Sequence, residues 1–236
     1  MKRGDFIWTG ALIILLSPLA IPTTHHAILA ATRAHPLVMG FVKFAILASL
    51  GELLGLRMRL GEWKTPVGMA WRVIVWGILG AVIALMFQVY SAGVQGAMNA
   101  GMLPGKGSML QTIATAFWIS TVMNTTFGPA MMAAHRVADT YIELCGGHIF
   151  RGGTSGTDVI AHTNWQTFFG FVIAKTIPFV WIPAHALTFL APPEYRVLIA
   201  AMLSVLFGGI LGFAARSGGA KPAGPGPQLE DVAVSR

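Results

Sequence analysis

The feature that most constrains this fold is a series of apolar stretches, each about as long as a bilayer is thick. Because an α-helix rises about 1.5 Å per residue, roughly 20 apolar residues cross the hydrocarbon core. Six segments of the 236-residue chain have this character: 6–21, which is short, 36–56, 70–93, 113–133, 168–191 and 197–215. The sequence therefore predicts an all-α fold, a polytopic transmembrane helix bundle that occupies residues 1–216.

Composition supports this class of fold and argues against a soluble globular domain. Hydrophobic residues make up 55% of the chain and charged residues 11%, whereas soluble domains average about 25% charged residues. The net charge of +7 would suggest nucleic-acid binding in a soluble protein, but here the basic residues lie in short loops between the apolar segments. We therefore expect the lipid bilayer as the main partner, a homo-oligomer or a larger membrane complex as a further one, and no nucleic acid.

The distribution of lysine and arginine predicts the orientation of the spans. Cytoplasmic loops retain positive charge. With six spans and both termini inside, eleven of the sixteen basic residues, including Arg72, fall on the inner side and three on the outer side. Lys43 and Lys175 lie within spans. This alternation predicts a multi-pass membrane protein with cytoplasmic termini, in the bacterial inner membrane or, as an alternative, in an organelle membrane.

The sequence also predicts the character of the two ends of the chain. Lys2 and Arg3 ahead of a short apolar centre also fit a secretory signal peptide. Its removal would leave five spans in the same orientation. The segment 217–236 is rich in Pro and Gly and has no apolar period, so it is predicted to be a disordered cytoplasmic tail.

The chain shows little support for metal or redox chemistry. Cys145 is the single cysteine, which excludes an intrachain disulfide. It pairs in sequence with His148, and two ligands fall short of the four, or three plus water, of a zinc site. We expect no metal, no cofactor and no enzymatic activity. An intramembrane enzyme that uses His135, Asp139 or Cys145 is the weaker alternative.

Polar residues inside the spans are candidates for function, because charge at membrane depth is costly and usually faces the interior of a bundle. Lys175 lies roughly 12 Å from the inner boundary of its span and Glu52 roughly 6 Å. We therefore predict that the two approach each other, as a structural ion pair or as part of a transport site. Asn124 and Thr125 lie at nearly the depth of Lys175 and either pack helices together or line a polar passage. These four residues form the predicted buried polar layer, whereas Lys43 is close enough to the outer end of its span to snorkel.

Two further patterns concern the shape and packing of the helices. Pro178 and Pro183 remove donors from the fifth span and leave the carbonyls of Ala174 and Phe179 without their usual partners, which predicts a kink. His185, further along, is expected near the outer interface. Small residues four apart predict close helix packing at three places: Gly51 and Gly55, Gly77 and Ala81, and Gly208 and Gly212.

Two stretches of the chain carry short motifs. The first is His35-Pro36 followed by Gly51-Glu52. The second, at 181–198, ends in Pro-x-x-Tyr-Arg-Val-Leu, and its motif residues are Trp181, Pro183, His185, Pro192, Tyr195 and Arg196. Together they resemble the family of small integral membrane proteins typified by the 22-kDa peroxisomal membrane protein and its mitochondrial inner-membrane relatives, in which the first motif has the same spacing and an Asp in place of Glu52.

This resemblance implies a function that the residues alone do not. Members of the family, which usually have about four spans, are thought to form or modulate membrane pores for ions or small solutes. We therefore expect a channel or permeability-modulating protein. The chain departs from the family at Leu56 and Thr188, where Gln and Asn are usual. A noncatalytic membrane subunit or assembly factor of a larger membrane complex is the alternative function.

Overall fold

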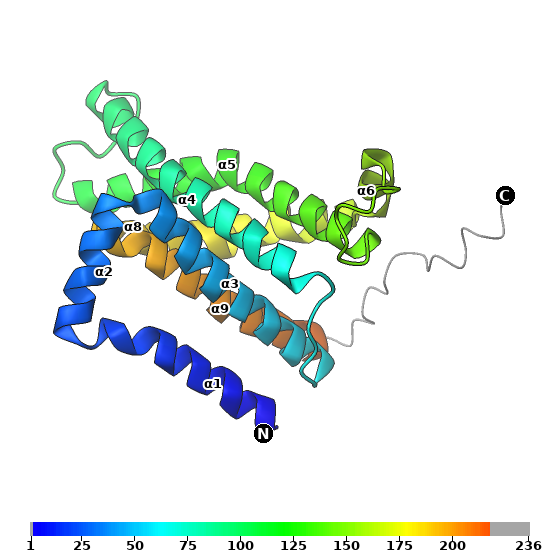
Figure 1. The fold of residues 1–236 in the computed structure, drawn as a ribbon. Coiled ribbons are helices and arrows are strands. Elements are labelled where there is room, and N and C mark those ends of the chain that lie inside the picture. The colour runs from blue at the N-terminus through cyan, green and yellow to red at the C-terminus, as the bar shows by residue number, and fades with distance from the viewer. Residues whose placement is uncertain (1, 218–236) are drawn as a thin grey trace.

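The computed structural model describes residues 2–217, and every element in this part of the chain is a helix (Figure 1). The elements are α1 (Arg3–Leu16), η1 (Ser17–Leu19), α2 (Pro22–Ala34), α3 (Pro36–Leu60), α4 (Met69–Asn99), α5 (Gln111–Leu144), α6 (Gly156–His162), α7 (Trp165–Thr167), η2 (Phe168–Trp181), α8 (Ile182–Leu190) and α9 (Pro193–Ser217). The all-helical prediction is confirmed for these residues. The predicted tail lies, from residue 218 onward, outside the described residues.

Helix α3 lies at the centre of the bundle, between α4 and α9, and α5 packs against α4 and α8. Helix α1 lies along the outside of the bundle, and α2 crosses from it to the start of α3 (Figure 1). The Trp8 indole of α1 donates to the backbone oxygen of Leu50, which ties α1 to α3. We call the two ends of the bundle the α3–α4 end, where residues 61–68 join these helices, and the α2 end.

Four stretches of helix in the described residues are long and apolar enough to cross a membrane: Pro36–Leu60, Met69–Asn99, Trp165–Leu190 and Pro193–Ile210. The pair Arg3–Leu19 and Pro22–Ala34 adds a fifth only if it counts as one span, because the two parts are bent by 83°. Six spans are therefore not confirmed. The expected span 113–133 lies in α5, which is long enough but less apolar because it contains Ser120, Asn124 and neighbouring threonines.

The outer faces of the helices are more apolar than expected for a soluble domain. The outer faces of the helices carry large apolar side chains such as Ile78, which is 53% exposed, and Phe179, which is 78% exposed. Within a mostly apolar core, several polar side chains are also buried, among them Arg72, Ser120 and Asn124. Because water disfavours the first group and hydrocarbon the second, this distribution fits a multi-pass membrane protein.

Glycine allows α3 and α9 to touch through their backbones. A Cβ placed on Gly208 would lie 2.3 Å from the carbonyl oxygen of Gly51, and one on Gly212 would lie 2.4 Å from that of Gly55. The close packing predicted from these two pairs is therefore present. Helix α4 also lies against α3, where Gly77 of the third predicted pair contacts the ring of Phe41.

Residues 168–181 form a π-helix, in which each N–H bonds to the carbonyl five residues back. Its last turn shows this register, because Ile182 N–H donates to the carbonyl of Ile177. The predicted kink assumed an α-helix, in which Pro178 would leave the carbonyl of Ala174 without a partner. In the π register, Pro178 instead lacks the N–H that would bond to the carbonyl of Ile173. Long π segments are rare, and single π turns often occur at functional sites.

Candidate functional site

Four charged side chains meet near the α3–α4 end, and we call them the Arg72 cluster. Arg72, on the first turn of α4, has a side chain that is 4% exposed. Its Nη1 lies 2.8 Å from Glu52 of α3 and 2.8 Å from Asp139 of α5, and its Nη2 lies 2.8 Å from Glu143. The Trp76 indole, one turn further along α4, donates to the second oxygen of Glu52 at 3.1 Å. One buried guanidinium is thus shared by three carboxylates from two other helices.

Local structure explains why these groups meet. Asp139 and Glu143 are four residues apart on α5 and therefore lie on one face. Helix α4 begins directly beside the end of α5, because Gly68 adopts a left-handed φ of 66° and packs against Ile142. A side chain at Gly68 would collide with Ile142, whose Cγ2 would lie 2.3 Å from the added Cβ. This close approach lets Arg72 reach both carboxylates.

His135 connects the Arg72 cluster to the interior of the bundle. Its Nδ1 lies 3.5 Å from Asp139, which is long for a hydrogen bond, and its ring lies 4.0 Å from that of Trp76. Burial raises the pKa of Asp139 to about 6, although Arg72 opposes this shift. Burial also lowers the pKa of His135 to about 4. Both residues lie beyond the expected span 113–133, and near neutral pH the imidazole is uncharged and the carboxyl is ionised.

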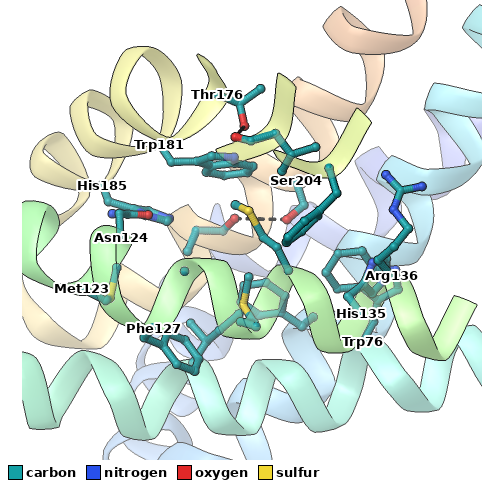
Figure 2. Close-up of a pocket in the computed structure, with 18 of the residues that line it drawn as sticks. Trp76, Met123, Asn124, Phe127, His135, Arg136, Thr176, Trp181, His185 and Ser204 are labelled. Carbon is teal, nitrogen blue, oxygen red and sulfur yellow. Dashed lines mark hydrogen bonds between the residues drawn. The ribbon is translucent and has the colours of Figure 1, made fainter. Parts of the chain in front are cut away.

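A cavity of about 310 Å³ lies inside the bundle (Figure 2). Trp76 and His135, which contact Glu52 and Asp139 of the Arg72 cluster, line it. Figure 2 shows Asn124 and His185 at one end of it and Trp76, His135 and Arg136 at the other. Asn124 and Arg136 are 12 residues apart on α5, which corresponds to about 18 Å. The middle is lined mainly by aromatic and methionine side chains, including Phe44, Phe87, Met123, Phe127, Met131, Phe168 and Phe171.

Asn124 and His185 form a polar pair inside the bundle. Asn124 is 2% exposed, and its amide nitrogen donates to the carbonyl of Ser120 at 2.8 Å. Its side-chain oxygen lies 3.1 Å from Nδ1 of His185, whose ring packs against Trp181. The position of His185 near the outer interface stays a prediction, and the structure adds that α8 turns this ring inward toward α5. Asn124 thus lies in a buried polar layer, but with a partner that the sequence pattern did not indicate.

Lys175 and Thr125 are not part of the interior. Both side chains are exposed. The two carboxylate oxygens of Glu52 contact Arg72 and Trp76, and Lys175 forms no ion pair with the residues that the structure describes. The predicted approach of Glu52 and Lys175 is therefore wrong. That prediction compared depths along two helices, and depth does not determine the side of the helix on which a residue lies.

The remaining family-like residues stabilise the α2 end. The hydroxyl of Tyr195 and Nε2 of His25 lie 2.8 Å apart and connect α9 to α2. Arg196 donates to the carbonyl of Ala191, just before Pro192 and the start of α9. These contacts are structural and lie away from the cavity.

The prolines of the fifth predicted span are exposed, whereas Lys43 is buried. Pro178 and Pro183 are exposed on the run from η2 to α8, whereas Trp181 between them lines the cavity. Lys43 does not snorkel: it is 8% exposed and donates to the hydroxyl of Thr32 at 2.9 Å, because α2 folds over this part of α3.

No family model, no curated protein and no solved structure matches this chain. The resemblance to the 22-kDa peroxisomal membrane protein family therefore stays a prediction. Function has to be inferred from the Arg72 cluster and the cavity.

Proposed function

We propose that this chain is an integral membrane protein that forms or modulates a passage for small solutes. The cavity carries the proposal. It extends for about 18 Å along α5, more than half of the roughly 30 Å of a hydrocarbon core. Helices that pack only for structure fill such a space with side chains at nearly crystalline density.

The lining favours small solutes over ions, the two classes that the family resemblance implies. Aromatic and methionine side chains surround most of the middle of the cavity. The hydroxyls of Thr176 and Ser204 also line it, but each donates to a carbonyl of its own helix, and the other polar side chains of the described lining lie at the two ends (Figure 2). An ion in such surroundings loses its hydration, which costs several kcal/mol or more without a charged partner. An uncharged or amphipathic molecule avoids most of this cost.

Basic residues favour an orientation with the α3–α4 end in the cytoplasm. Arg57, Arg59, Lys64 and Arg151 lie at this end, near the turn between α3 and α4 or the segment after α5. The start of α1 is held there too, because Asp5 accepts hydrogen bonds from Arg57. By the positive-inside rule this end faces the cytoplasm, and we place the protein in a bacterial inner membrane.

Flux through reconstituted protein tests the proposal. Liposomes that contain the chain should release small uncharged solutes faster than empty vesicles. Val172→Trp, which fills the cavity from η2, should reduce this flux. Phe179→Trp is the matched control, because Phe179 lies on the same helix and is 78% exposed on its outer face. Release no faster than from protein-free vesicles would remove the proposal.

A second candidate function, a noncatalytic subunit of a larger membrane complex, is favoured by the outer face of α4. Gln88 and Gln95 are exposed and, at seven residues apart, lie on one face. A Cβ added to Gly93 or Gly96 would meet open space in the described part of the chain. Exposed amides and small residues are typical of helix–helix interfaces in membranes. Purification in mild detergent should then recover a stoichiometric partner, and a clean monomer would count against this function.

A further inference from the structure

We infer that the cavity binds an anionic amphiphile, with its acidic head beside Arg136 and its apolar body extended along α5 toward Asn124. This assignment rests on the proposed function, because it names a class of molecule that binds in the same cavity. Three features of the cavity carry it: the cation at one end, the apolar middle, and the neutral polar pair at the other end.

Arg136 supplies the cation. It lines the cavity at the end shared with Trp76 and His135 (Figure 2) and is only partly exposed. No carboxylate oxygen of the described residues lies within 4 Å of its guanidinium, since the carboxylates at this end of α5 face Arg72 instead. A partly buried guanidinium favours a carboxylate or phosphate, which it can bind with two parallel hydrogen bonds.

The middle of the cavity suits a hydrocarbon body. Phe87, Phe127, Met123 and Met131 line it, and methionine adapts readily to ligands of different shape. A volume of about 310 Å³ is at the small end of the range for ligand pockets. It therefore fits one short chain rather than a two-chain phospholipid.

The far end requires no second charge on the ligand. Asn124 and His185 lie within hydrogen-bond distance of each other, at 3.1 Å, and Asn124 also donates to Ser120. The facing atoms of this pair are thus hydrogen-bonded within the protein, and no lysine or arginine of the described lining lies at this end. Among the described lining residues, the cation lies at one end of the cavity and the other end has none. This asymmetry matches a molecule with one charged head.

The wall that η2 contributes supports a binding role. Phe168, Phe171, Val172 and Thr176 of this π-helix all line the cavity. π turns are often found at functional sites. Here four side chains from about two turns of one helix line the same cavity.

Equilibrium binding of three probes tests the assignment. Dodecanoate, dodecyl phosphate and dodecanol share one chain length and differ in the head group. They are titrated calorimetrically into the full chain in phosphatidylcholine nanodiscs. One or both anions should bind about tenfold or more tightly than the alcohol, as expected for a hydrogen-bonded ion pair. Comparison of the two anions shows whether the site prefers a carboxylate or a phosphate.

Variants locate the binding site. Arg136→Gln should bring all three probes to similar affinity, whereas Arg151→Gln, an exposed arginine at the same end, should keep the preference for anions. Val172→Trp should weaken all three probes. Because the readout for Arg136→Gln is a ratio of affinities within one protein, a partial loss of folded protein does not change it.

The outcomes separate this assignment from the proposed function. Equal affinity of wild-type protein for acid and alcohol, or an anion preference that survives Arg136→Gln, overturns the assignment. Solute flux without binding of any probe also overturns it and leaves the proposed function standing. Anion-selective binding without solute flux overturns the proposed passage and supports the binding site.

Discussion

Arg72→Gln is the sharpest test of how this bundle accommodates charge. The substitution leaves Glu52 and Asp139, whose side chains are 20% and 18% exposed, without their cation. Removing one partner of a buried ion pair costs about 3–5 kcal/mol. Glu143 adds little, because its side chain is 63% exposed and water screens its charge. We therefore expect the free energy of unfolding to fall by roughly 3–5 kcal/mol, a large part of the roughly 5–15 kcal/mol typical of a folded domain.

Unfolding in mixed detergent micelles, followed by tryptophan fluorescence, measures this change. Lys64→Gln is the matched control, because it breaks the surface pair with Glu62, whose side chains are 61% and 50% exposed. It should cost less than about 1 kcal/mol. Adding Glu52→Gln to Arg72→Gln should restore about 1 kcal/mol or more, since it removes one of the two unpaired charges. Equal costs for Arg72→Gln and Lys64→Gln, or no recovery in the double variant, would refute the reasoning.

Other contacts lead to three further predictions. Gly208→Ala should destabilise the fold by about 1–3 kcal/mol by overpacking against α3, and its unfolding midpoint is compared with that of Gly170→Ala, whose Cβ meets open space. Lys175→Met should leave solute flux unchanged, because this side chain is exposed and does not line the cavity. A large change in flux would show that Lys175 belongs to the functional site. Between pH 4 and 6, the raised pKa of Asp139 makes stability fall as pH rises, whereas the lowered pKa of His135 makes stability fall as pH drops. As pH is lowered from 6 to 4, the unfolding midpoint of Asp139→Asn should therefore fall, whereas that of His135→Gln should rise. The opposite trends would contradict the two pKa shifts.

The helical class and the α3–α9 contact could be predicted because both depend on local pattern. The length of an apolar stretch can be read from each segment alone, and the predicted spans 36–56 and 70–93 lie within α3 and α4. Glycines four apart indicate where two backbones can approach, as at Gly51 and Gly208. The 83° bend between α1 and α2 and the π register of η2 could not be predicted in this way. Both depend on how a segment packs against the rest of the bundle.

The charged site could be predicted only in part. The sequence predicts that Lys175 needs an acidic partner inside the bundle, and depth alone indicates Glu52 as that partner, whereas the structure pairs Glu52 with Arg72. The charge count places Arg72 among the inner basic residues that determine topology, whereas in the structure it lies on the first turn of α4 with its side chain buried. A usable pattern was present nevertheless. The chain has nine acidic residues in total, so Asp139 and Glu143 on one helical face next to a span indicate a buried cation nearby.

The cost of burying charge explains the Arg72 cluster. Together with the gain from burying apolar surface, it also determines which molecules the cavity can accept. A charge brought into a medium of low dielectric constant costs of order 20 kcal/mol before relaxation, and Arg72 is accommodated because three carboxylates lie 2.8 Å from it. Apolar surface instead gains about 25 cal/mol per Å² on burial, so 200 Å² of hydrocarbon contributes about 5 kcal/mol. A neutral solute can therefore move through the apolar middle, whereas the head of an anionic amphiphile is held at Arg136 and cannot follow its chain toward Asn124. Anionic amphiphiles should accordingly occupy the cavity and slow the flux of neutral solutes through it.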